Sequence, residues 1–117
     1  MPTIRDVVQA LARRPGVHAA IVLGRDGLLI DSAVKDGVDA DGVAALVPPV
    51  VAACGSLGLA SASGDFGTGA VEFSNGTALV TTLTPEALLA LIVARGTNVG
   101  AILYEIQKHR AAIAGLL

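Results

Sequence analysis

The chain has 117 residues, of which 53% are apolar and 15% are charged, and its formal net charge is −2. An intrinsically disordered chain is excluded, because disorder requires low hydrophobicity and high charge, and the length is typical of one domain spanning residues 1–117. The eight Lys and Arg residues form no basic stripe and only 3% of residues are aromatic, so we expect no nucleic-acid partner. The mean hydropathy of +0.69 predicts apolar surface that a second subunit, a partner or a membrane covers.

The first predicted element is a helix that begins after Thr3. Thr3 and Asp6 have the spacing of a capping box, and apolar residues between Ile4 and Leu11 recur on one helical face. Pro15 ends this helix, because the residue before a proline disfavours helical geometry. The charged start lacks the apolar core of a signal peptide, and the single cysteine excludes an internal disulfide. We therefore expect a reducing, cytoplasmic location.

Two apolar runs, Val17–Leu23 and Leu28–Val34, are predicted to form a β-hairpin. The Asp26-Gly27 pair between them is a strong turn signal. Both runs carry apolar residues at odd and even positions, so we expect the sheet to be covered, at least in part, on both faces. His18 has no Cys, Asp or Glu at metal-ligand spacing and is expected to be structural.

Residues 42–64 carry no charge, and a segment of this length can span a bilayer. Pro48-Pro49 in its middle and the acidic flanking residues oppose a transmembrane helix, so we predict no membrane insertion. We favour one buried amphipathic helix, bent at the prolines and capped by Asp39 or Asp41. Five residues are expected to face the sheet, namely Val43, Leu46, Val47, Val50 and Cys54. The opposite face has small side chains, namely Ala44, Ala45, Pro48, Ala52, Ala53 and Ser56.

A second hairpin is predicted from Ala70–Phe73 and Thr77–Leu83. The Asn75-Gly76 pair between these runs is preferred in a type I′ turn. The next apolar run, Ala87–Ala94, fits either a helix or a central strand, and local rules leave both open. A last helix follows, capped by Thr97 or Asn98.

The last helix has an apolar stripe that includes Ile102 and Ile106, whereas His109 and Arg110 are expected on its solvated side. Cys54 lies on the apolar stripe of the long helix and is expected to be a buried structural thiol. Gly55-Ser56-Leu57-Gly58 lacks the lysine of a phosphate-binding loop. We therefore predict no catalytic, cofactor-binding or metal-binding residues.

Two features are candidates for protein contacts. The small face of the long helix either packs between subunits or partners, or lies against its own sheet or solvent. The glycine-rich segment Gly67–Phe73 is either a blunted edge strand or a strand that pairs with its own copy.

The segment Gly16–Ser32, with Gly-Val, an apolar strand and Asp-Gly-Leu, resembles the first hairpin of Roadblock/LC7 domains. Thr97-Asn98-Val99-Gly100 resembles the Asn-Leu-Gly helix start of that family. The resemblance implies an α+β fold, with a five-stranded antiparallel sheet, the first and last helices on one face and the long helix on the other. It also implies that Ala87–Ala94 is the central strand.

The resemblance further implies a non-enzymatic homodimeric regulator that binds a small Ras-like GTPase, and that speeds its GTP hydrolysis in prokaryotic relatives of the MglB type. A structural adaptor or light chain without nucleotide dependence is the alternative, and a ligand-sensing domain is a third reading. The expected partner-binding residues on the long helix are Ala45, Pro48, Pro49, Ala52 and Ser56. The expected dimer interface consists of Gly67, Thr68, Gly69, Ala70, Val71, Glu72 and Phe73.

The sequence departs from the family pattern at Pro48-Pro49, in the middle of the long helix. The chain also ends soon after its last helix, so regulation by a C-terminal tail is not expected. The long helix contains no Arg or Lys and cannot supply an arginine finger. Arg25, at the tip of the first hairpin, is the one arginine that we retain as a contributor to GTPase activation.

Overall fold

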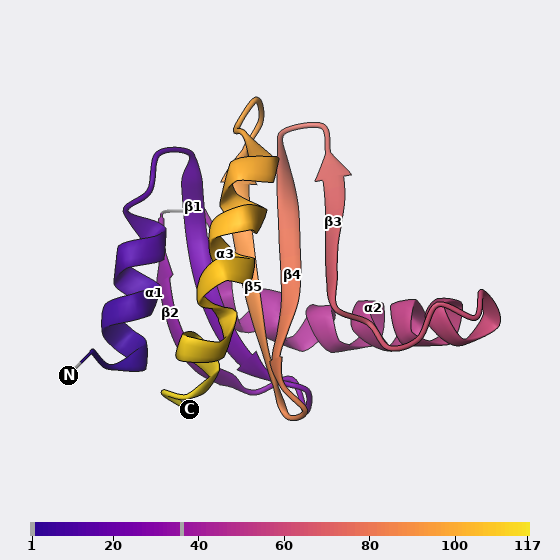
Figure 1. The fold of residues 1–117 in the computed structure, drawn as a ribbon. Coiled ribbons are helices and arrows are strands. Elements are labelled where there is room, and N and C mark those ends of the chain that lie inside the picture. Colours follow the sequence, from indigo (N-terminus) through magenta and orange to yellow (C-terminus); the bar gives the residue numbers. More distant parts are fainter. Residues whose placement is uncertain (1, 36) are drawn as a thin grey trace.

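The computed structural model describes residues 2–35 and 37–117, which form one five-stranded sheet and three helices (Figure 1). The strands follow the order β2-β1-β5-β4-β3, and all neighbours are antiparallel. This arrangement confirms the predicted α+β fold. The elements are α1 (Ile4–Ala12), β1 (Val17–Gly24), β2 (Leu29–Val34), α2 (Ala40–Ala60), β3 (Thr68–Phe73), β4 (Gly76–Thr84), β5 (Ala87–Ala94) and α3 (Val99–Ala114).

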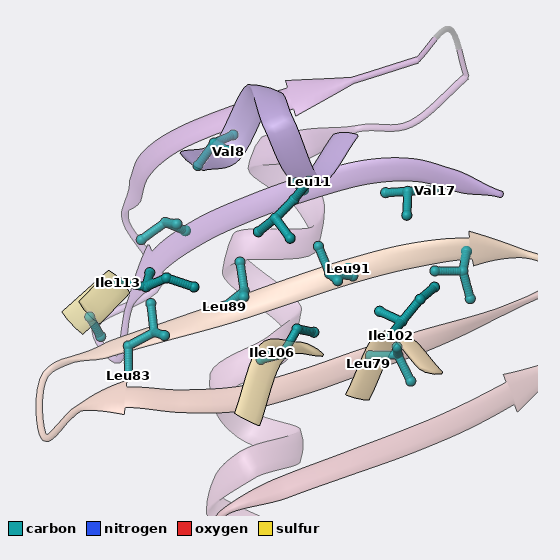
Figure 2. Packing of buried hydrophobic residues seen from close by; sticks show 14 residues of the cluster. Val8, Leu11, Val17, Leu79, Leu83, Leu89, Leu91, Ile102, Ile106 and Ile113 are labelled. Atoms are coloured by element: carbon teal, nitrogen blue, oxygen red, sulfur yellow. The ribbon is translucent and has the colours of Figure 1, made fainter. Parts of the chain in front are cut away.

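One face of the sheet is covered by α1 and α3 (Figure 1). Val8 and Leu11 of α1 and Ile102 and Ile106 of α3 are buried against strand residues such as Leu89, and together they form the larger core cluster (Figure 2). Each helix contributes one apolar stripe, as expected for helices that lie on the surface of a sheet.

The opposite face is covered by α2, which contributes Ala44 and Val51 to a second buried cluster with Ile21 and Ala90. The strands therefore bury side chains on both faces, which explains why their sequences do not alternate between apolar and polar residues.

The alternative left open at Ala87–Ala94 is resolved as a strand. β5 pairs with β1 on one side and with β4 on the other. Leu88, Leu89 and Leu91 are each no more than 1% exposed. A central strand with both faces covered requires an uninterrupted apolar run, and this run has the length of such a strand.

Local hydrogen bonds confirm the predicted helix starts and settle two alternatives. The Thr3 hydroxyl accepts from the Asp6 backbone N–H at 3.2 Å, and the Asp6 carboxylate accepts from the Thr3 backbone N–H at 2.9 Å. Hydrogen bonding of the Asp6 carboxylate, first to the Thr3 backbone N–H and then to the Thr3 side chain, holds the pKa of Asp6 below its usual value. Asp39 caps α2 and Asn98 caps α3, each accepting from the backbone N–H three residues later, at 3.0 and 3.1 Å.

The second hairpin is confirmed, but its predicted turn is wrong. Phe73 pairs with Gly76, so the loop consists of Ser74 and Asn75 and Gly76 already belongs to β4. In the described chain neither Asn75 nor Gly76 has the positive φ that a type I′ turn requires. Glycine is needed at position 76 for close packing, because a Cβ there would lie 2.8 Å from the carbonyl oxygen of Val93 in β5.

Candidate protein-interaction surfaces

The long helix α2 crosses the strands and continues beyond β3, the edge of the sheet (Figure 1). It is one helix that includes Pro48 and Pro49, as predicted. The expectation that it is buried is wrong, because Ala44 and Val51 are the buried residues within it. Its C-terminal half extends past the sheet and therefore has no strand to cover it. By length and composition, α2 is also apolar enough to cross a membrane.

The side of α2 that faces the sheet differs in part from the prediction. Val43 and Val47 pack against the second core cluster as expected, and Cys54 is half-buried. Leu46 and Val50 point away from the sheet and are 70% and 47% exposed. The reason is that α2 is apolar around most of its circumference, so hydrophobic spacing does not identify which side meets the sheet.

Ala44 is completely buried, although the prediction placed it on the small face away from the sheet. The turn of the first hairpin approaches α2 at this point. A Cβ added to Gly27, which has φ +86°, would lie 3.7 Å from the carbonyl oxygen of Ala44 and 3.6 Å from the Cα of Ala45. The α2 backbone at Ala44 and Ala45 therefore lies close to the hairpin turn, and the Ala44 side chain packs in the second core cluster.

The outer side of α2 is an exposed surface without charge. Of the predicted partner-binding residues, Ala45, Pro49, Ala52 and Ser56 are exposed, and Pro48 is half-buried. Beside them lie large apolar side chains that are also exposed, with Leu57 at 67% and Leu59 at 83%. We call this outer side the α2 platform; it consists of Ala45, Leu46, Pro49, Val50, Ala52, Ala53, Ser56, Leu57, Leu59 and Ala60. A continuous exposed apolar surface of this kind marks an interaction site.

The outer edge of β3 is the second candidate surface. In the described residues β3 pairs with β4 alone, so its other edge presents unpaired backbone groups. Val71 pairs with Ala78, whose neighbour Ile92 packs in the α2 cluster, so Val71 and Phe73 lie on the α2 side of the sheet. They are 43% and 59% exposed. Glu72 consequently points to the α3 side.

The remaining residues of the predicted dimer segment lie along the same edge. Thr68, Gly69 and Ala70 belong to β3. Gly67 precedes the strand, and its carbonyl oxygen accepts from the Thr82 backbone N–H at 2.9 Å. The structure thus places six of the seven predicted residues in one edge strand.

A groove of about 720 Å³ lies between the middle of α2 and the end of β4. Arg25, Ala52 and Phe66 are among the residues that line it. Arg25 is held there by two hydrogen bonds: its Nη2 donates to Thr82 Oγ1 at 3.2 Å, and its backbone N–H donates to the Glu86 carbonyl oxygen at 2.9 Å. The groove therefore places an arginine from the first hairpin beside the α2 platform.

Arg110, expected on the solvated side of α3, is half-buried instead. Its Nη1 donates to Thr81 Oγ1 at 3.5 Å, and Thr81 Oγ1 lies 2.7 Å from Thr68 Oγ1. Thr81 is only 2% exposed. The sequence contains a signal that reveals this contact, since Ile102, Ile106 and Arg110 are spaced four residues apart and share one helical face.

The described part of the chain contains no cluster of three His, Cys, Asp or Glu residues that could hold a metal ion. Cys54 is a half-buried free thiol on α2. His18 is half-buried at a register shift in β1, and His109 is exposed on α3. These three side chains lie on three different elements. The features that stand out chemically are thus the α2 platform, the β3 edge and the two arginines near them.

A family model described as the Roadblock/LC7 domain matches residues 3–93. No curated protein sequence matches the chain. Among solved structures, MglB of Myxococcus xanthus is 22% identical with a TM-score of 0.86 and covers 97% of this chain and 93% of its own. A Roadblock/LC7 domain from Streptomyces avermitilis is 23% identical, with a TM-score of 0.86 and 97% of both chains covered. An MglB with a tetrameric arrangement is 19% identical, with a TM-score of 0.85 and 97% and 86% covered.

Proposed function

Because the chain belongs to the Roadblock/LC7 domain family, we propose that it is a non-enzymatic homodimeric regulator that binds a small Ras-like GTPase. The observation that carries this proposal is the α2 platform, which is apolar and uncharged and extends past the open edge of β3. Similarity to MglB proteins, one of them in a tetrameric arrangement, supports assembly with copies or partners.

The homodimer forms by pairing of β3 with its counterpart in a second copy. Two edges related by a two-fold axis pair antiparallel and join the two sheets into one. The overhanging half of α2 then lies over the strands of the second copy. Val71 and Phe73 on the α2 side of β3 are exposed in the protomer. Dimerisation therefore covers these two apolar side chains.

In this dimer the two copies of α2 lie on the same side of the joined sheet and together form the GTPase-binding face. The small side chains of Ala45, Ala52 and Ser56 allow a partner's backbone to approach closely. No arginine or lysine lies on α2, so any acceleration of GTP hydrolysis arises from arranging the groups of the GTPase itself, or from Arg25 in the adjoining groove.

The test is binding and single-turnover GTP hydrolysis with the small Ras-like GTPase encoded nearest to this gene. Binding that depends on the bound nucleotide supports a GTPase regulator, and concentration-dependent acceleration identifies it as an activator. Equal binding to the GTP-bound and GDP-bound forms would favour the adaptor alternative. Failure to bind in either state would contradict the proposal.

The matched variants for this test are Ala52→Glu on the α2 platform and Ala111→Glu on α3, since both alanines are exposed on helices. A carboxylate at position 52 places a desolvated charge in the interface, so binding should fall by at least about tenfold, whereas the variant at position 111 should bind normally. Intact binding by Ala52→Glu would show that the α2 platform is not part of the binding site. Association of the wild-type protein with lipid vesicles would indicate that a membrane, and not a protein, covers α2.

A further inference from the structure

Two opposite charges lie on the α3 side of the sheet near the open edge of β3. Glu72 is exposed near the end of β3, and Arg110 reaches toward its start through Thr81 and Thr68. Neither residue forms an ion pair within residues 2–35 and 37–117. Arg95 lines a groove with Glu72, and Asp65 lines a groove with Arg110, but neither is an ion-pair partner.

Two-fold symmetry brings these charges together. In an antiparallel pair, residues directly opposite each other point to the same face of the sheet. A pairing centred on β3 therefore has Ala70 or Val71 opposite its own counterpart. Glu72 of the second copy then lies opposite Thr68 or opposite Ala70. In the first register it is directly across from Thr68, and in the second it is the diagonal neighbour, about 7–8 Å away.

Thr68 is the residue that connects this position to Arg110. Its hydroxyl lies 2.7 Å from that of Thr81, which accepts from Arg110 Nη1 at 3.5 Å. A glutamate opposite Thr68, or diagonal to it, has its carboxylate within reach of this guanidinium. The reach of both long side chains spans the remaining distance in either register.

We propose that Arg110 of each protomer pairs with Glu72 of a second copy of this chain, giving two symmetric intersubunit ion pairs. The inference rests on the proposed homodimer and restricts its pairing to these two registers. The ion pairs complement the apolar contacts on the α2 side, because they lie on the opposite face of the same strand. A further slip, which places Glu72 opposite its own counterpart, moves each carboxylate about 7 Å farther from its arginine and brings the two Glu72 carboxylates together, so the ion pairs disfavour that alignment of β3.

The test is a charge-swap cycle with Glu72→Arg, Arg110→Glu and the double variant, in which the dimer dissociation constant is measured by sedimentation at low salt. Each single variant should weaken the dimer about five- to thirtyfold, because two symmetric pairs are lost and like charges face each other. The double variant should return to within about threefold of wild type, since the swap restores opposite charges. High salt should reduce these differences.

Lys108→Glu is the matched control, because Lys108 is exposed on the same helix and the change in net charge is identical. It should leave the dissociation constant unchanged. Thermal unfolding of Arg110→Gln is measured at low protein concentration, where the protomer is monomeric. A lower melting temperature than wild type would show that losing the hydrogen bond to Thr81 destabilises the protomer itself.

The outcomes separate this inference from the proposed function. If the wild-type chain forms a dimer but the double variant is no tighter than the weaker single variant, the ion pair is refuted and the homodimer stands. If Glu72→Arg is rescued by Arg95→Glu and not by Arg110→Glu, the partner of Glu72 is Arg95 and the inference is wrong. A wild-type chain that stays monomeric contradicts the homodimer, and this inference with it.

Discussion

Replacing Phe73 with serine is expected to weaken the homodimer without unfolding the protomer. Phe73 is 59% exposed on the edge strand β3, on the side that α2 of a second copy would cover in the proposed homodimer. Complete burial of a large apolar side chain contributes about 1.5–3 kcal/mol, so covering the exposed 59% contributes about 0.9–1.8 kcal/mol per protomer. Two-fold symmetry doubles this to about 2–3.5 kcal/mol, which is about a 30- to 300-fold change in the dissociation constant.

The assay is sedimentation velocity over a series of protein concentrations. Tyr104→Ser is the matched control, because Tyr104 is an aromatic residue that is 69% exposed on α3, the helix on the face of the sheet opposite α2. The control should dimerise like wild type, and the melting temperature of the dilute Phe73→Ser protomer should be close to that of the wild-type protomer. A Phe73→Ser dimer as tight as wild type would refute the reasoning, since it would show that Phe73 is not covered.

Three further predictions concern Arg25, Pro49 and Asp6. If GTP hydrolysis is accelerated, Arg25→Ala should reduce the acceleration while GTPase capture on a column persists; unchanged acceleration would show that the GTPase supplies every catalytic group. Pro49→Ala restores a helical N–H donor for the Ala45 carbonyl and should stabilise the protomer by up to about 3 kcal/mol in urea unfolding; destabilisation would show that the α2 geometry depends on the proline. Asp6→Asn should destabilise the protomer at neutral pH, because a lowered folded-state pKa contributes stability above the ordinary value. That difference should shrink as the pH falls below about 3.9, and a pH-independent difference would contradict it.

The sequence predicts the hairpins and helix starts well because their signals are local. Thr3 and Asp6 lie three residues apart, and Asp26-Gly27 separates two apolar runs. The structure realises both signals, as a capping box and as a hairpin turn. The segment Ala87–Ala94 has no such signal, since helix or strand depends on two neighbouring strands and on helices that cover both faces. Family resemblance supplied that information, whereas local rules could not.

The α2 platform is the part of the candidate site that sequence reasoning resolved least well. Its position depends on which side of an almost uniformly apolar helix meets the sheet. Leu46 and Val50 fit the hydrophobic period of a buried face, yet α2 lies on the sheet through Ala44 and Val51. This orientation depends on contacts between residues far apart in the chain, among them the approach of Gly27 to the α2 backbone and the packing of Val51 with strand residues. Large apolar side chains such as Leu46 and Leu57 therefore lie in solvent, a pattern that hydrophobic spacing does not predict and that is typical of a surface that a partner covers.

The strand order also has a consequence for folding kinetics. Three of the four strand pairings join consecutive strands, whereas β1 and β5 pair across most of the chain, for example through Leu23 and Leu88. Closing such a long loop costs more entropy than forming a hairpin, and non-local pairings of this kind slow folding. The pairing of β1 with β5 is therefore expected to form last, after β1 has paired with β2 and after β3, β4 and β5 have paired with one another. Since α2 belongs to the segment between them, the side of α2 that packs on the sheet stays in water until β1 and β5 pair. During that interval the chain is most prone to aggregate.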